Sequence, residues 1–283
     1  MQNKEGALDI IEIIKSIILG IVEGITEWLP ISSTGHMILL DEFINLKVSD
    51  SFMELFLVVI QLGAICAVPV LFFHRINPFS RRKSEAEKRA TWNLWGKVVV
   101  GVMPAAIIGV FLDDVIEETN SAVVSVALIV YGVLFILIEK LNKKRRSRVE
   151  AVEELTYLDA IKIGSFQVLS LIPGTSRSGS TIMGGLVSGV SRTASAEFSF
   201  FMAIPVMLGA SALKILKFIM DGFVATSDEI LLLVIGMVVS FAVSLIAIKF
   251  LMDFVKRHDF KPFGIYRIAL GAIIILYFII KNI

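Results

Sequence analysis

The residues best suited to chemistry lie in two short segments rich in Ser, Thr and Gly. The first is EGITEWLPISSTGHM, from Glu23 to Met37, and the second is PGTSRSGST, from Pro173 to Thr181. Glu23 and Glu27 are four residues apart, so a helix would place both carboxylates on one face. Two adjacent carboxylates repel each other unless a cation neutralises them, and magnesium bound with water and phosphate oxygens would do so. The spacing favours a metal site, with an interfacial helix carrying two solvated acids as the alternative.

Hydroxyl groups and a histidine follow the first proline, Pro30. One of Ser32, Ser33 and Thr34 could act as a nucleophile, while the others could cap a new helix. His36 could transfer a proton near neutral pH, or it could be a satisfied interior group.

The second segment carries one arginine, Arg177, inside a Gly/Ser/Thr loop. A guanidinium group at such a position suits phosphate, because its donors form a planar fork. Ser176, Ser178 and Thr181 could add hydroxyl donors, and an arginine that snorkels to the interface is the alternative. Together, the two segments fit phosphoryl transfer, in which a metal and an arginine stabilise charge while a positioned nucleophile attacks.

The elements that must hold these segments are apolar helices. The chain has 283 residues and a mean hydropathy of +0.82. Hydrophobic residues make up 56% of it, whereas a soluble domain has about 45–50% apolar residues. Long apolar runs approach the roughly 20 residues that cross a bilayer. They cover 55–73, 98–112, 123–138, 230–248 and 268–280. A soluble helical protein would need polar faces on these helices, so we predict an all-α, polytopic integral membrane protein.

Other bulk features exclude several classes. The net charge of +1 gives no reason to expect a nucleic-acid partner. The single cysteine, Cys66, rules out a disulfide within the chain. The apolar stretch near the N-terminus runs directly into the first segment without a cleavage-site pattern, so we do not expect a removed signal peptide.

Charge position predicts orientation. Basic residues gather in 75–97 and 140–148, with a smaller cluster in 256–261, whereas 113–120 is acidic and has no Lys or Arg. Basic loops mark the cytoplasmic side, so the predicted helices 52–74, 97–112 and 121–140 run inward, outward and inward. The later helices 196–220, 229–252 and 263–281 run outward, inward and outward.

Opposite orientations in two sets of three helices predict two inverted-topology repeats. We place the first repeat at 1–141, a cytoplasmic linker at 142–157 and the second repeat at 158–283. An offset of 143 residues supports this division, since it matches Pro30 with Pro173, Ser33 with Ser176 and Glu54 with Glu197.

Each repeat begins with a segment that fits no ordinary span, at about 20–40 and about 164–189. Proline disfavours helical geometry before it, so the helices should break near Leu29 and near Ile172. The result would be two re-entrant hairpins, entering from opposite faces, whose tips meet near mid-membrane with helix N-termini suited to phosphate. Glu54 and Glu197, which begin long helices, are second-tier candidates that could line the cavity or only mark helix starts.

The same segments resemble the undecaprenyl-pyrophosphate phosphatase family, also called bacitracin-resistance proteins. EFSFFMAIPVMLGA (197–210) and FGIYRIALGA (263–272) extend the resemblance over nearly the whole chain. It implies a hydrolase of the bacterial plasma membrane that removes the terminal phosphate of undecaprenyl diphosphate and so recycles the lipid carrier for peptidoglycan synthesis. It also implies bacitracin resistance, a site open to the outer side, and a need for Mg²⁺ or Ca²⁺.

Carried over by motif, the resemblance assigns Glu23 and Glu27 to the metal and water, and Arg177 to the diphosphate. Ser33 and His36 would serve attack and proton transfer, with either a phospho-serine intermediate or direct attack by water. A transporter or flippase of a polyprenyl phosphate lipid is the main alternative, because inverted repeats with broken helices are typical of transporters. A homodimer is plausible, but no motif requires one.

Overall fold

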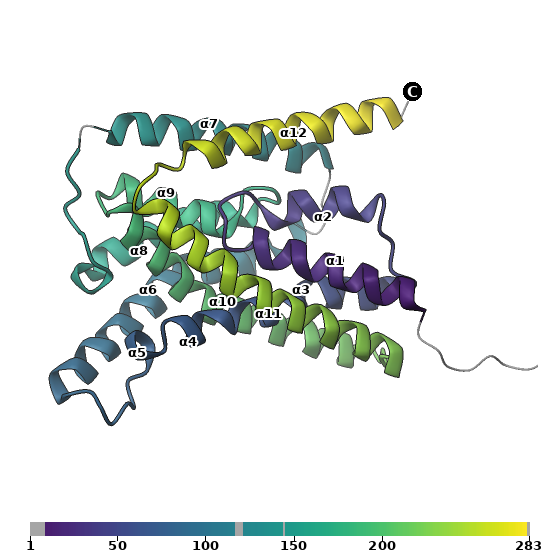
Figure 1. Ribbon diagram of the computed structural model, residues 1–283, viewed down its shortest axis with the longest axis horizontal. Helices are drawn as coiled ribbons and strands as arrows, with labels where there is room; N and C mark the ends of the chain where they lie inside the picture. The colour runs from purple at the N-terminus through teal and green to yellow at the C-terminus, as the bar shows by residue number, and fades with distance from the viewer. Residues whose placement is uncertain (1–8, 117–120, 144, 282–283) are drawn as a thin grey trace, which may run out of the picture.

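The computed structural model describes residues 9–116, 121–143 and 145–281, and the described part is built from helices without a named strand (Figure 1). The first half contains α1 (Ile10–Thr26), α2 (Ser33–Asp41), α3 (Asp50–Ile65), α4 (Ala67–Leu71), α5 (Phe73–Ile76), α6 (Glu85–Ile116) and α7 (Ser121–Asn142). The second half contains the 3₁₀ turn η1 (Val152–Glu154), α8 (Tyr157–Gln167), the 3₁₀ turn η2 (Val168–Leu171), α9 (Arg177–Val187), α10 (Arg192–Met220), α11 (Ser227–Val255) and α12 (Lys261–Lys281).

Within the described residues, six helical segments are long and apolar enough to cross a membrane, which confirms the predicted class. They are Asp50–Leu71, Glu85–Phe111, Ser121–Asn142, Arg192–Met220, Ser227–Val255 and Lys261–Lys281. The second begins at Glu85 rather than near residue 97, because a polar, charged stretch continues the helix beyond the apolar run.

The first span also differs in its continuity from the single predicted helix 52–74. It divides into α3 and α4 at Cys66, and the short helix α5 follows after its end at Leu71. Pro69 lies in α4 and has no N–H to donate to the carbonyl of Ile65, so the helix cannot continue straight through this turn.

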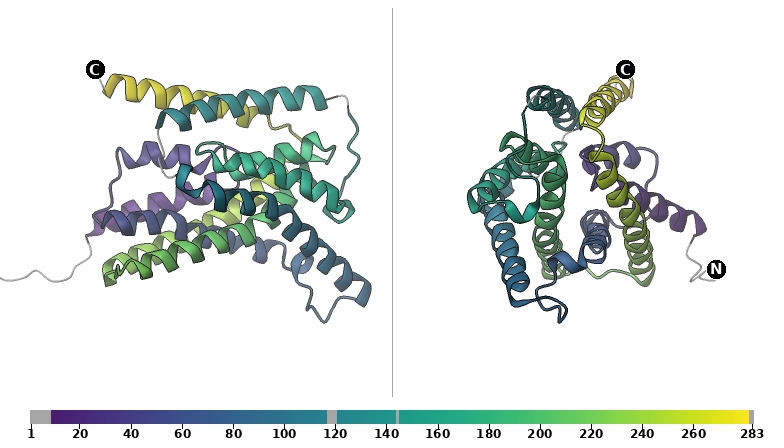
Figure 2. Two further views of the ribbon diagram at one scale, coloured as in Figure 1. Left: turned by 180° about the vertical axis from the view of Figure 1, so that it is seen from behind. Right: turned by 60° about the vertical axis from the view of Figure 1, so that its left-hand side comes forward.

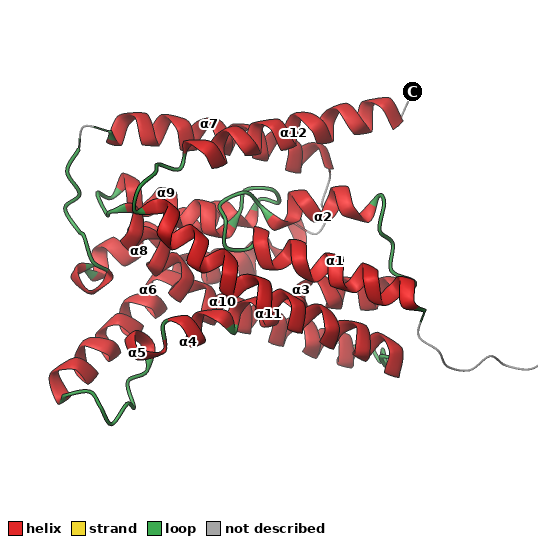
Figure 3. Ribbon diagram, in the orientation of Figure 1, coloured by secondary structure: helices red, strands yellow, loops and turns green. Residues whose placement is uncertain are grey.

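Both predicted helix breaks are present. The first hairpin segment leaves α1 at Thr26 and re-enters a helix at Ser33, whereas the second leaves α8 at Gln167, passes through η2 and re-enters at Arg177. Figure 3 shows the loop between α1 and α2 in the middle of the molecule rather than at one of its ends. The breaks therefore bring irregular backbone into the interior of the helix bundle.

Helices of the two halves interlock. α1 packs along α11, and α8 packs along α6, on opposite sides of the bundle (Figure 2, right). Glycines permit both contacts: a Cβ on Gly20 would lie 2.6 Å from the carbonyl oxygen of Gly236, and one on Gly164 would clash with the carbonyl oxygen of Gly101. Small residues at such crossings let helix backbones approach closely.

The long helices also alternate in direction. Followed by colour in Figure 1, α3, α7 and α11 run toward one end of the molecule, and α6, α10 and α12 run toward the other. The basic segments 77–84, 145–151 and 256–260 all lie at the left end of this view.

Candidate active site

The two broken helices meet through their loops. The hydroxyl of Ser178, at the start of α9, donates to the carbonyl oxygens of Glu27 at 3.1 Å and Leu29 at 3.4 Å. Trp28, fully buried, packs its ring edge-on against Phe200 of α10 with centroids 5.3 Å apart. Contacts with α9 and α10 therefore hold the first loop in place.

The loops end in the same backbone geometry. Ser32 and Ser176 are the N-caps of α2 and α9, each with φ of 73°, and they are the non-glycine residues with positive φ in the described chain. Their hydroxyls accept hydrogen bonds from the backbone N–H groups of Gly35 at 3.4 Å and Gly179 at 3.2 Å. The predicted match of Ser33 with Ser176 is therefore wrong by one residue.

The cause of this shift is the different length of the two loops. One residue separates Pro30 from its capping serine, whereas two separate Pro173 from its own. Matched by their caps, the hairpins are offset by 144 residues, which aligns Ser33 with Arg177.

Glu27 joins the two hairpins chemically. Its carboxylate is buried, and Oε1 accepts hydrogen bonds from Arg177 Nη2 at 3.0 Å and Nε at 3.4 Å. Its other oxygen, Oε2, accepts a hydrogen bond from the hydroxyl of Ser33 at 3.3 Å. An acid and a hydroxyl from the first hairpin thus form one cluster with an arginine that lies 150 residues from the acid in the sequence.

A third nitrogen of Arg177, Nη1, is held by α10. Nη1 donates to the backbone oxygen of Ser199 at 2.8 Å and lies 3.5 Å from its hydroxyl. Thr181 donates to that same hydroxyl at 2.7 Å. Thr181 and Ser178 therefore act in hydrogen bonds that orient the loops and Arg177, while Thr34 is exposed.

Glu23 lies one helical turn before Glu27 and is 1% exposed, and its Oε1 has no hydrogen-bond partner. A buried carboxylate oxygen without a partner is costly unless a cation joins it. Among the described residues, no group of three or more His, Cys, Asp or Glu side chains is placed so that it could hold a metal ion. Two carboxylates still fit Mg²⁺, which commonly takes only one or two from the protein and completes its shell with water and substrate phosphates.

His36 takes part in a different contact. Its Nδ1 lies 2.7 Å from the carbonyl oxygen of Ser32, its Nε2 lies 2.7 Å from the hydroxyl of Tyr266, and the two rings stack with centroids 5.5 Å apart. Both ring nitrogens are thus engaged, and the group within hydrogen-bond reach of Ser33 is Glu27.

The two second-tier acids pair with basic residues outside this cluster. Glu54 accepts from Lys214 at 2.6 Å, and Glu197 accepts from Arg75 Nη1 at 2.6 Å. Arg75 also binds Glu153. Burial alone would lower the pKa of the Arg75 guanidinium, but the two carboxylates raise it above its ordinary value. These acids link helix ends across the two halves.

Sequence reasoning missed Arg267, Ser199 and Tyr266 as parts of this region. Arg267 is fully buried and donates from Nη1 to the carbonyl of Pro30 at 3.3 Å and from Nη2 to the carbonyl of Gly174 at 2.9 Å. A charge inside an apolar span is rare and usually functional, so its place within FGIYRIALGA was a usable signal. Nothing comparable marks Ser199, which acts partly through its backbone.

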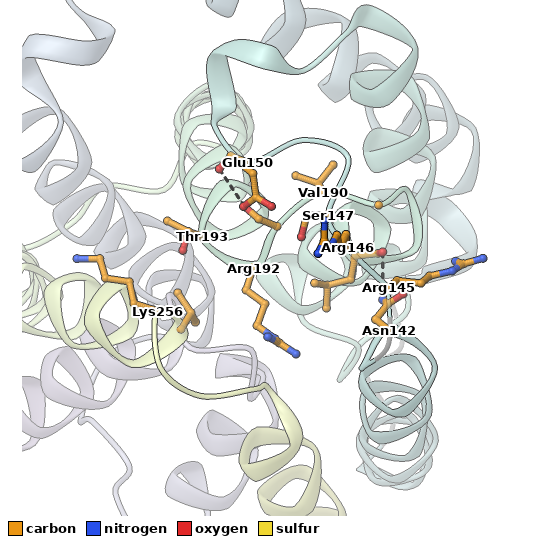
Figure 4. Close-up of a pocket in the computed structure, with 13 residues that line it drawn as sticks. Asn142, Arg145, Arg146, Ser147, Glu150, Val190, Arg192, Thr193 and Lys256 are labelled. Atoms are coloured by element: carbon orange, nitrogen blue, oxygen red, sulfur yellow. Dashed lines mark hydrogen bonds between the residues drawn. The ribbon is translucent and has the colours of Figure 1, made fainter.

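A separate cavity of about 230 Å³ lies among basic residues at the left end of Figure 1, and Figure 4 shows its lining. Arg145, Arg146, Arg192 and Lys256 surround it with one acid, Glu150. Two of these cations have carboxylate partners, Glu139 for Arg192 and Asp253 for Lys256. The cavity adds to the concentration of positive charge at this end and is distinct from the Glu27 cluster.

The fold and the cluster define a polytopic membrane protein with a polar site where the loops of two interrupted helices meet. A family model described as bacitracin resistance protein BacA matches residues 16–273. The chain belongs to this family.

Curated relatives agree along nearly their whole length. The chain is 58% identical over 274 residues to an undecaprenyl-diphosphatase of Enterococcus faecalis, covering 95% of this chain and 98% of the relative. It is 57% identical to an undecaprenyl-diphosphatase of Acetivibrio thermocellus, with the same coverage of both chains. Undecaprenyl-diphosphatase 1 of Clostridioides difficile is 55% identical, over 95% of this chain and 97% of the relative.

Proposed function

We propose that this protein is an undecaprenyl-diphosphate phosphatase, which hydrolyses undecaprenyl diphosphate to undecaprenyl phosphate and inorganic phosphate. The observation that carries the proposal is the position of Glu27, which accepts from Arg177 on one oxygen and from Ser33 on the other. A phosphoryl group beside these residues would meet an anion-binding guanidinium, a nucleophilic oxygen and a base at once. The undecaprenyl-diphosphatase relatives support the same substrate.

In this mechanism Arg177 binds the diphosphate oxygens, and Ser199 keeps its guanidinium pointed at them. Glu27 Oε2 takes a proton as an oxygen nucleophile attacks the terminal phosphorus and the bond to undecaprenyl phosphate breaks. That nucleophile is either Ser33 Oγ, whose phosphoester water then hydrolyses, or water held in the same place. Glu23 and Glu27 would hold Mg²⁺, with Ca²⁺ as a substitute, and the ion would supply charge stabilisation on the phosphoryl oxygens.

The helix arrangement supports two inverted repeats, each with a re-entrant hairpin. Corresponding helices run in opposite directions, and the packing of α1 on α11 mirrors that of α8 on α6. The positive-inside rule places the basic end in the cytoplasm. The α1–α2 hairpin would then enter from the outer side of the bacterial plasma membrane, and the site would open there.

This arrangement suits a substrate with a long isoprenoid tail. The tail can remain in the lipid beside the apolar outer faces of the spans, while only the diphosphate enters the polar cluster. Hydrolysis on the outer side would return the carrier lipid to peptidoglycan synthesis and lower the amount of diphosphate that bacitracin can sequester.

The test is phosphate release from undecaprenyl diphosphate by the purified protein in detergent, with Mg²⁺ and with EDTA. We expect metal-dependent release by the wild type and a loss of about 10³-fold in Glu27→Gln, because the amide neither takes the proton nor holds the cation. Arg177→Ala should also lose nearly all activity.

Glu54→Gln is the matched control, since it neutralises an exposed acid outside the cluster and should keep wild-type activity. No release by folded wild-type protein with Mg²⁺ present would refute the proposal. Movement of a polyprenyl phosphate across proteoliposomes would then be measured in its place.

A further inference from the structure

Arg267 is a buried cation without a carboxylate partner among the described residues. It lies in the span α12, is 0% exposed, and its Nε has no hydrogen-bond partner. Its guanidinium carbon lies 5.9 Å from the centre of the Tyr131 ring. Such a charge in the interior of a membrane protein is costly to bury, so its retention calls for a specific task.

The two carbonyl groups that Arg267 binds occupy equivalent positions. Pro30 lies two residues before the cap Ser32, and Gly174 lies two residues before the cap Ser176. One planar guanidinium group therefore contacts the same point in both loops. A fork of donors suits two acceptors with a fixed separation, whereas a lysine presents a single point charge.

In the first half of the chain, α7 packs along α12 beside Arg267, and it contributes an aromatic side chain there instead of a charge. α7 and α12 cross at Gly132 and Gly264, where a Cβ on either glycine would lie 2.7–2.8 Å from the carbonyl oxygen of the other. Three residues further along each helix lie Phe135 and Arg267, both fully buried. Both side chains also approach Gly179 in the first turn of α9. A Cβ added to Gly179 would lie 3.2 Å from Arg267 Nη1 and 3.3 Å from the ring of Phe135.

We propose that Arg267 is a positioning residue that sets the spacing between the two loops, and through it the spacing between Glu27 and Arg177. Glu27 lies three residues before Pro30, and Arg177 lies three residues after Gly174, so each reacting group is close to a bridged carbonyl. The proposal rests on the phosphatase function and assigns Arg267 no contact with the substrate. Its donors act on backbone oxygens, so its loss should affect turnover more than substrate affinity.

The test compares Arg267→Lys and Arg267→Met with the wild type, using as a control Arg192→Lys at the start of α10, where the arginine is paired with Glu139. We expect both Arg267 variants to lose about 10²-fold in kcat, because a displacement of about 1 Å can cost that much. The KM should stay within about twofold. Arg192→Lys should keep kcat within about twofold, because lysine can still pair with Glu139.

Hydrogen exchange supplies a measurement that does not depend on turnover. Amides of residues 28–35 and 173–179 should exchange faster in both Arg267 variants, while α7 and α12 keep their protection. Full kcat in Arg267→Lys would overturn the proposal, since charge alone would then suffice. Faster exchange throughout the protein, or in only one loop, would also overturn it.

The two proposals fail separately. A wild type that releases no phosphate removes the proposed function, while hydrogen exchange still decides whether Arg267 bridges the loops. An active wild type whose Arg267 variants keep full kcat leaves the function intact and removes the positioning role.

Discussion

The two hairpins share a backbone plan and differ in charge. Each has a proline in its loop and restarts on a serine with φ of 73°. Matched by these caps, Glu23 aligns with Gln167, Glu27 with Leu171 and Ser33 with Arg177. The first hairpin therefore supplies the acids and the second supplies the cation. Two helix breaks with the same capping geometry can thus build one asymmetric cluster of polar side chains, because each contributes only part of it.

Among exchanges between the two hairpins, the largest expected effect comes from making the first hairpin resemble the second. Glu23→Gln should lower phosphate release by about 10²- to 10³-fold and raise the Mg²⁺ concentration needed for half-maximal rate. The neutral amide keeps the size of the side chain but attracts a cation weakly. The rate is measured across a Mg²⁺ titration. If the rate of phosphate release depended on Mg²⁺ concentration as in the wild type, Glu23 would not be part of the metal site.

The reverse change, Gln167→Glu, tests whether the second hairpin can tolerate an acid. Gln167 is 1% exposed and its Oε1 has no partner. We expect a loss of about 3 kcal/mol in the free energy of unfolding, the scale for a charge at the centre of a membrane helix. Thermal unfolding in detergent measures it. Gln167→Met removes the unpartnered oxygen and should unfold at the wild-type temperature or above.

A smaller effect, on stability, tests whether the two hairpins share one backbone geometry at their capping serines. Ser32→Ala and Ser176→Ala should each destabilise the protein by about 1 kcal/mol, because each removes a helix cap. Ser32→Gly and Ser176→Gly should cost about half as much or less, since glycine suits positive φ. Unfolding midpoints compare the four variants. Different losses at the two positions would contradict the shared geometry.

The smallest effect is expected outside both hairpins. Glu54 is largely exposed and pairs with Lys214. Glu54→Gln should change stability by less than about 1 kcal/mol, the usual range for an exposed ion pair. Phosphate release should stay within about twofold. A large loss of activity would show that Glu54 takes part in the site. It would contradict the assignment of the active-site residues to the two hairpins.

Much of this arrangement was predictable from the sequence. Apolar runs and prolines predicted the six spans and the two breaks, because bilayer thickness and the missing proline N–H act locally. The hydrogen bond between Arg177 and Glu27, 150 residues apart, could not be predicted from spacing alone. It depends on how α9 and α10 pack against the first loop. The one-residue error in matching the hairpins arose because proline is conspicuous, whereas the capping serine fixes the geometry.

The glycine contacts also determine the order in which the molecule can be completed. Gly20 of α1 packs against Gly236 of α11, which leaves the ribosome 216 residues later. At 5–20 residues per second this delay is roughly 10–40 s. α8 faces no such delay, because its partner α6 is already made. The first hairpin, which carries Glu23 and Glu27, is synthesised early. Its helix α1 can pack against α11 only after almost the entire chain has been made.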